Sequence, residues 1–142
     1  MPGQTPSLAA EIELVKETYA AINRNDIPAA VTAFDPQMEW IEPPDFPTPG
    51  TYRGHADVMA HISRGRNTWA EGGCNLEQFI AAGNKVVVFV HALVRLKNHT
   101  DWIDGRFADV YTFRDGKVIE VRTFGKRQDA LEWAGAKGSA AT

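Results

Sequence analysis

The segment expected to form a long strand, residues 85–96 (KVVVFVHALVRL), limits the possible folds more than any other part of the chain. Side chains of a strand alternate between its two faces, and one face of this segment is apolar at every position. These positions are Val86, Val88, Val90, Ala92, Val94 and Leu96. The other face mixes apolar residues with His91 and Arg95. We therefore expect an antiparallel sheet that rests on the core with one face and directs His91 outwards.

Most of the second half of the chain is predicted to belong to the same sheet, and the first half is predicted to be mainly helical. The predicted strands cover residues 75–82, 85–96, 106–113 and 117–124. The predicted helices cover residues 8–22, a short segment capped by Asp26, residues 55–69, and a short segment with Leu131 and Trp133. Residues 43–54 hold four prolines and two glycines, so we expect a surface loop there. Helices followed by a run of strands are typical of an α+β fold.

Length and composition limit the kind of protein. A chain of 142 residues is expected to form one domain, 1–142, with frayed tails at 1–7 and 135–142. The longest apolar run, residues 86–90, is too short to cross a membrane, and no basic leader precedes an apolar stretch, so a cytoplasmic protein is expected. The net charge of −3 is spread without long runs, which argues against nucleic acid as a partner. The single cysteine, Cys74, excludes an internal disulfide.

A glutamate at the end of the MEWIE strand, residues 38–42, is the first candidate for chemistry. Alternation places Glu42 on the same face as Trp40 and Met38, which we expect to face inwards. Two prolines follow Glu42 directly and end the strand. Burial raises the pKa of a carboxyl group and can make it a base near neutral pH. The alternative is a structural carboxylate, hydrogen-bonded at a strand end.

Asp109 is the second candidate, and its position depends on the register of the last hairpin. A three-residue loop at residues 114–116 pairs Asp109 with Val121 and gathers Asp109, Tyr111 and Ile119 on one inward face. A two-residue loop at residues 115–116 instead sets Asp109 opposite Arg122 in a cross-strand ion pair. We favour the first register, because it brings the apolar residues together and makes Asp109 an acid on an apolar face.

The order of these segments resembles the nuclear-transport-factor-2-like superfamily, in particular its SnoaL-like and ketosteroid-isomerase-like branches. The resemblance rests on YAAINRNDIPAAVTAFDPQMEWIEP, GTYRGHADVMAHI and DVYTFRDGKVIEVRTFG, and it extends from about Leu8 to Trp133. It implies a cone-shaped, curved antiparallel sheet wrapped around three N-terminal helices, in ααβαβββ-type order, which encloses one apolar pocket. It also implies a homodimer through the outer face of the sheet.

The resemblance assigns roles to the two acids and adds a histidine. Glu42 before Pro43 matches the position of the isomerase's base, and Asp109 before Phe113 matches its protonated oxyanion-hole acid. A pocket phenylalanine falls on His61, which is also compatible with a solvent-exposed helix edge. The isomerase's catalytic tyrosine falls on Thr18, whereas its neighbour Tyr19 belongs to the apolar stripe of the first helix. The implied pocket walls, each equally expected as plain core, are Trp40, Trp69, Val90, Ala92, Tyr111 and Val121, with Phe46 at the mouth.

Two functions are therefore open. The first is a small enzyme without cofactor or metal, an isomerase, cyclase or hydratase, that uses acid–base chemistry on a hydrophobic small molecule through Glu42, Asp109 and His61. The second is a noncatalytic module of the same fold that binds a small ligand or dimerises. No pair of these residues has the helical spacing of metal-binding histidines, and neither a phosphate-binding glycine loop nor a serine-hydrolase motif occurs.

Overall fold

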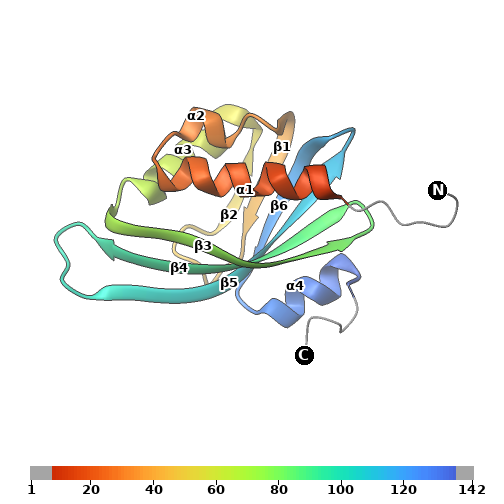
Figure 1. Cartoon of the computed structure of the whole chain (residues 1–142). Coiled ribbons are helices and arrows are strands. Elements are labelled where there is room, and N and C mark those ends of the chain that lie inside the picture. Colours follow the sequence, from red (N-terminus) through yellow and green to blue (C-terminus); the bar gives the residue numbers. More distant parts are fainter. Residues whose placement is uncertain (1–7, 137–142) are drawn as a thin grey trace, which may run out of the picture.

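The computed structural model describes residues 8–136 and confirms the α+β fold (Figure 1). The helices are α1 (Ala9–Asn23), α2 (Ile27–Ala30), α3 (Gly54–Arg66) and α4 (Arg127–Ala134). The strands are β1 (Phe34–Glu42), β2 (Gly50–Arg53), β3 (Trp69–Ala82), β4 (Lys85–Leu96), β5 (Trp102–Arg114) and β6 (Lys117–Phe124). The predicted tail 1–7 and residues 137–142 of the predicted tail 135–142 lie outside the described residues.

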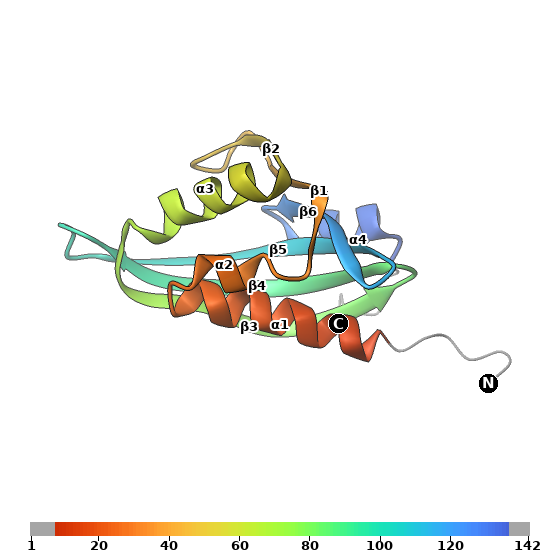
Figure 2. The same ribbon diagram turned by 90° about the horizontal axis from the view of Figure 1, so that it is seen from above.

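The six strands form one curved sheet in the order β2-β1-β6-β5-β4-β3. Neighbouring strands are antiparallel except β1 and β6, which run parallel. The predicted curved antiparallel sheet is therefore confirmed, with β1 and β6 as its one parallel pair. These two strands lie far apart in the chain, so no hairpin requires them to run antiparallel. Figures 1 and 2 show α1, α2 and α3 over one face of the sheet, and Figure 1 shows α4 under the opposite face.

The main core fills the space between the three helices and the sheet. Val86, Val88, Val90 and Val94 are buried in β4 as its alternation predicts. A second cluster lies on the opposite face, where Ala130 and Leu131 of α4 pack on the sheet. Their partners there are Val87, Phe89, Ala108 and Val110. Ala108 and Val110 are therefore buried although they face away from α1 to α3, because α4 covers this part of the sheet.

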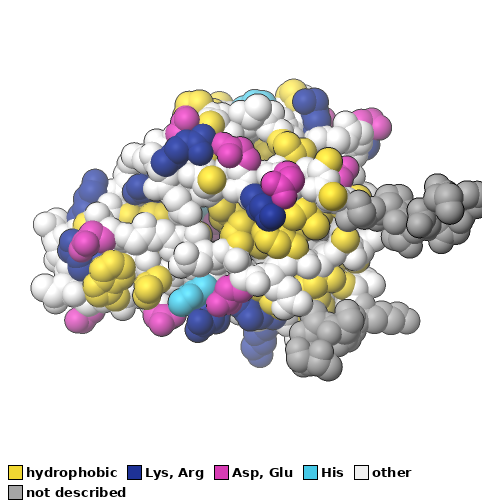
Figure 3. Space-filling view, in the orientation of Figure 1, with side chains coloured by type: hydrophobic (Ala, Val, Ile, Leu, Met, Phe, Trp, Pro, Cys, Tyr) yellow, Lys and Arg dark blue, Asp and Glu magenta, His cyan; other side chains and the backbone are white. Residues whose placement is uncertain are grey.

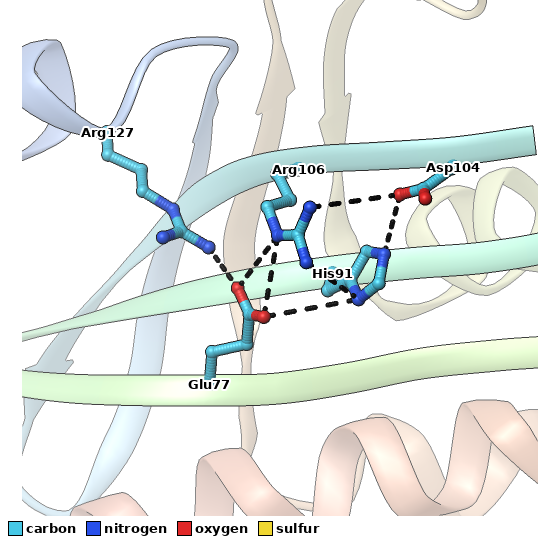
Figure 4. Close-up of polar contacts among 5 residues, drawn as sticks. All are labelled: Glu77, His91, Asp104, Arg106 and Arg127. Carbon is cyan, nitrogen blue, oxygen red and sulfur yellow. Dashed lines mark hydrogen bonds and ion pairs between the residues drawn. The ribbon is translucent and has the colours of Figure 1, made fainter.

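The outer face beside α4 carries a network of charged side chains (Figure 4). Glu77 of β3 contacts Arg127 and lies 3.4 Å from Nε of Arg106. His91 contacts Asp104, with 2.6 Å between Nε2 and Oδ1, which confirms its outward direction. Figure 3 shows that positive and negative side chains are also interspersed over the face seen in Figure 1. Within residues 8–136, no helix is long and apolar enough to span a membrane.

Two segments differ from their predicted structure. Residues 50–53 of the predicted loop form β2, an edge strand whose residue Tyr52 lies opposite Trp40 of β1. The four prolines of the segment all precede this strand and do not interrupt it. Helix α3 ends at Arg66, so Trp69 is the first residue of β3 and does not belong to the helix. Gly72 lets β3 extend this far, because a Cβ there would lie 2.1 Å from the backbone oxygen of Leu93.

The last hairpin follows neither predicted register throughout. Its turn has two residues, Asp115 and Gly116, both with positive φ, so Arg114 lies opposite Lys117. An irregularity at Ile119 then shifts the pairing by one residue, and Asp109 lies opposite Thr123. Asp109 is consequently buried, with 2% of its surface exposed, and it is not paired with an arginine. The inward direction of Asp109 was predicted, but the bulge that produces it was not.

Candidate functional site

A cavity of about 460 Å³ lies between the helices and the concave face of the sheet. Its walls come from α1, β1, the loop after β1, α3 and strands β3 to β6. The large apolar and aromatic residues that line it are Ile22, Trp40, Phe46, Ile62, Trp69, Val94, Leu96, Ile103 and Phe107. The cavity is of the size that accepts a drug-sized molecule, and Glu42, His61, Tyr19 and Asp109 place polar groups in it.

Glu42 ends β1 and lines this cavity, as alternation from Trp40 predicts. Its side chain is 14% exposed and accepts three hydrogen bonds. Trp40 Nε1 donates to Oε2 over 3.1 Å, and the hydroxyl of Thr48 donates to Oε1 over 3.0 Å. Nε2 of His61 lies 2.7 Å from Oε2. Three donors from three segments therefore hold the carboxylate in one orientation.

His61 lies in α3 with 5% of its surface exposed. Of its two predicted positions, the pocket is therefore right and the solvent-exposed helix edge is wrong. Its ring stacks on Tyr52 of β2, with 3.9 Å between the ring centroids and an angle of 15° between the planes. When Nε2 donates to Glu42, Nδ1 is left as the proton acceptor, and this buried Nδ1 has no hydrogen-bond partner within residues 8–136. A carboxylate bonded to an imidazole fixes the tautomer and stabilises the imidazolium that forms on protonation.

Asp109 lies in β5 and forms a second polar group in the cavity. The hydroxyl of Tyr19 donates to its Oδ2, and the hydroxyl of Thr123 donates to Oδ1 over 2.6 Å. The pKa of Asp109 is raised to about 6. Burial is the main cause, the two hydrogen bonds act in the opposite direction, and the charge of Glu42 adds to the increase. Asp109 therefore exchanges its proton close to neutral pH.

The resemblance to the isomerase places the catalytic tyrosine at Thr18, but the tyrosine that reaches this site is Tyr19. The aligned position, Thr18, bonds only backbone oxygens, those of Leu14 and Ala30. Tyr19 instead reaches from α1 to Asp109, and burial raises the pKa of its phenol. The apolar stripe of the first helix contained the signal, because a tyrosine at a fully buried position needs a partner for its hydroxyl.

The structure separates the predicted wall residues into two sets. Trp40 and Trp69 line the cavity, and so does Phe46, which was expected at its mouth. Val90, Tyr111 and Val121 are fully buried in the core and are not among the lining residues. Ala92, also outside the lining, lies opposite Cys74 in the sheet. The cavity is thus formed farther along the sheet, by Val94, Leu96 and Phe107, where α1 does not fill the concave face.

Cys74 also lines the cavity, but it is not a prepared nucleophile. Burial raises the pKa of its thiol to about 12, so the reactive thiolate does not form at neutral pH. Among residues 8–136, no group of three or more histidine, cysteine, aspartate or glutamate side chains is arranged to hold a metal ion.

Comparison with known proteins gives one family and many similar folds. The sequence profile of the SnoaL-like domain matches residues 15–121. No curated protein sequence matches the chain. An NTF2-like protein of unknown function from Burkholderia pseudomallei is 24% identical, with 89% of this chain and 98% of the other covered and a TM-score of 0.74.

Two further solved structures carry chemical names. TerC, crystallised with polyporic acid, is 24% identical over 89% of this chain and 98% of its own, with a TM-score of 0.73. A protein from Jannaschia sp. that is named a SnoaL-like polyketide cyclase is 16% identical over 96% of this chain and 100% of its own, with a TM-score of 0.73. At these identities the likeness concerns the fold.

Proposed function

The chain belongs to the SnoaL-like domain family, and on this premise we propose that it is an enzyme that uses general acid–base catalysis, without a cofactor, on a hydrophobic small molecule. The observation that carries this proposal is the pairing of polar groups in a mainly apolar cavity. Glu42 is bonded to His61, and Asp109 is bonded to Tyr19. The polyketide cyclase name and the polyporic acid complex among the similar structures support a substrate of this general kind.

The pair of Glu42 and His61 takes the proton from the substrate. The reaction is proton abstraction from a carbon next to a carbonyl group, which leads to isomerisation or cyclisation. Glu42 is the base of the pair, and it holds the abstracted proton until it returns it to the product; His61 orients the carboxylate by donating from Nε2. Tyr52 and Trp40 hold the imidazole and the carboxylate in place, so little rearrangement is needed when the charge moves.

The pair of Asp109 and Tyr19 stabilises the carbonyl oxygen of the substrate, on which negative charge develops when the proton is removed. Burial raises the pKa of the Tyr19 phenol, so this hydroxyl keeps its proton and remains a donor. The charge of Glu42 raises the pKa of Asp109, so ionisation of one acid favours the protonated form of the other. The two carboxyl groups thereby take opposite roles: Glu42 is the base, and Asp109 is a hydrogen-bond donor in its protonated form, which predominates below about pH 6.

Deuterium incorporation tests this proposal without knowledge of the substrate. Apolar cyclic ketones are incubated with the protein in D₂O, and exchange next to the carbonyl is followed by NMR. We expect the wild type to accelerate exchange and Glu42→Gln to lose about 100-fold to 10,000-fold of that rate while it stays folded. Glu120→Gln is the matched control, because Glu120 lies in β6, pairs with Arg122 and does not line the cavity. Equal rates for wild type and Glu42→Gln would contradict the assignment.

The second candidate function is a binding module of the same fold. It is favoured by the observation that both acids are hydrogen-bonded within the protein, as structural carboxylates are. In that case the ketones shift the NMR signals of cavity residues without any accelerated exchange. The homodimer through the outer face of the sheet and a cytoplasmic location stay predictions.

A further inference from the structure

Two arginines line the cavity, and neither is paired with an acid. Arg64 and Arg66 lie in the last turn of α3. Six of the nine arginines in the sequence form ion pairs with carboxylates: Arg24, Arg53, Arg95, Arg106, Arg122 and Arg127. The third unpaired arginine, Arg114, borders the turn between β5 and β6. Unpaired guanidinium groups within residues 8–136 are therefore concentrated at the cavity.

The guanidinium group of Arg66 is held in place without being neutralised. Its Nε donates to the backbone oxygen of Ile22 over 2.8 Å, and Nη2 donates to that of Asn23 over 3.0 Å. The same group lies 5.0 Å from the ring centroid of Trp69, which also lines the cavity. Carbonyl oxygens and an aromatic face orient a cation but leave its full charge uncompensated.

The side chain of Arg64 is exposed, so its guanidinium group is more available to a ligand than that of Arg66. Among the described residues Arg64 makes no hydrogen bond or ion pair, and its Cζ lies 5.8 Å from the ring centroid of Tyr52. The acids of the cavity are engaged elsewhere, since Glu42 bonds His61 and Asp109 bonds Tyr19. Both arginines thus present free N–H donors in the fork arrangement that matches a carboxylate.

From this distribution we propose that the natural ligand is an amphiphilic anion, with an apolar body in the cavity and a carboxylate-like group bound by Arg64 and Arg66. The proposal rests on the cavity being the ligand site. Arg64 follows His61 by three residues in the helix, so their Cβ atoms lie roughly 5–6 Å apart. The anionic group then binds about one helical turn from the proton-transfer pair, close to the carbon that reacts.

A purely structural role for the two arginines makes a different prediction. Basic residues in the last turn of a helix favour its dipole, and Arg66 also ties α3 to the end of α1. That role affects the stability of the protein but gives the cavity no preference for a charged ligand. Dependence of affinity on ligand charge is therefore the property to measure.

Matched pairs of aryl carboxylates and their neutral amides, such as biphenyl-4-carboxylate and biphenyl-4-carboxamide, provide this measurement. Binding is followed through quenching of tryptophan fluorescence and through NMR shifts. We expect the carboxylate to bind about 10-fold or more tightly than the amide, in the range of charge-assisted hydrogen bonds. Arg64→Gln should weaken carboxylate binding much more than amide binding and so remove most of this difference. Arg114→Gln, the same charge change far from the cavity, should behave as the wild type does.

Two further variants separate the possible outcomes. Arg64→Lys keeps the charge and should retain part of the preference, while the glutamine variant loses it. Glu42→Gln should still bind the carboxylate more tightly than the amide, even if it loses exchange activity. The anion site can therefore be confirmed even if the catalytic proposal fails. Equal affinities within each pair for the wild type would overturn the anion site, as would the absence of binding by every pair at millimolar concentration.

Discussion

Replacement of Asp109 by asparagine should make the protein more stable at neutral pH and less active. The pKa of Asp109 is raised by burial from its ordinary 3.8 to about 6. A group whose pKa is raised on folding binds more protons in the folded state between these two values, so the free energy of unfolding falls as the pH rises from about 4 to 6. At 1.36 kcal/mol per pKa unit, the ionised carboxylate costs the folded protein about 3 kcal/mol above pH 6.

Asparagine has nearly the same shape and never ionises, so it avoids this cost. Tyr19 and Thr123, which donate to Asp109, can rotate their hydroxyl groups to bond the amide. We therefore expect the stability of Asp109→Asn, relative to the wild type, to increase by about 3 kcal/mol between pH 4 and pH 8.

Urea unfolding of both proteins at a series of pH values measures this difference, and any fixed effect of the substitution cancels. Asp115→Asn in the exposed β5–β6 turn controls for the loss of one negative charge. A relative stability that stays constant from pH 4 to pH 8, or that decreases, would refute the reasoning. Loss of ketone exchange in the stabilised variant would show that Asp109 is kept for function at the expense of stability.

Two further substitutions test the packing around the site. The hydroxyl of Tyr111 is buried and makes no hydrogen bond of regular geometry among residues 8–136, although it lies near the hydroxyl of Tyr19. Tyr111→Phe should therefore raise the free energy of unfolding, measured by chemical denaturation, by about 1 kcal/mol. A lower free energy of unfolding in the variant would show that Tyr19 is a hydrogen-bond partner that stabilises the fold. Gly72 has φ of 100° and faces the backbone of Leu93, so Gly72→Ala should lower stability by about 3 kcal/mol, whereas Gly65→Ala, with open space in α3, should not lower it. Equal melting temperatures of the two alanine variants would contradict this difference in stability.

Local patterns were enough to predict most of the sheet and one side of the site. Alternation alone placed Glu42 beside Trp40 on the inward face of β1, and it separated the buried valines of β4 from His91. These predictions succeed because a strand with one buried face leaves its side chains only two directions. The resemblance then supplied what alternation cannot, namely that Glu42, His61 and Asp109 come from different elements to one cavity.

The parts that could not be predicted depend on contacts between distant segments. The bulge at Ile119 has no local signature, yet it decides that Asp109 lies opposite Thr123. The edge strand β2 forms because β1 offers it a partner, although a proline-rich segment precedes it directly. Tyr19 looked like a core residue until Asp109 was placed beside it. Periodicity shows which side chains are buried, but it does not show which of them meet.

The central claim is that Asp109 is a hydrogen-bond donor with a raised pKa in a mainly apolar cavity and not an ordinary structural carboxylate. Titration of its side-chain carboxyl carbon by NMR, in protein labelled with carbon-13, tests this directly. The account predicts a midpoint near pH 6, the value to which burial raises the pKa of Asp109. A midpoint at the ordinary aspartate value of 3.8 would contradict the claim and would favour the binding module.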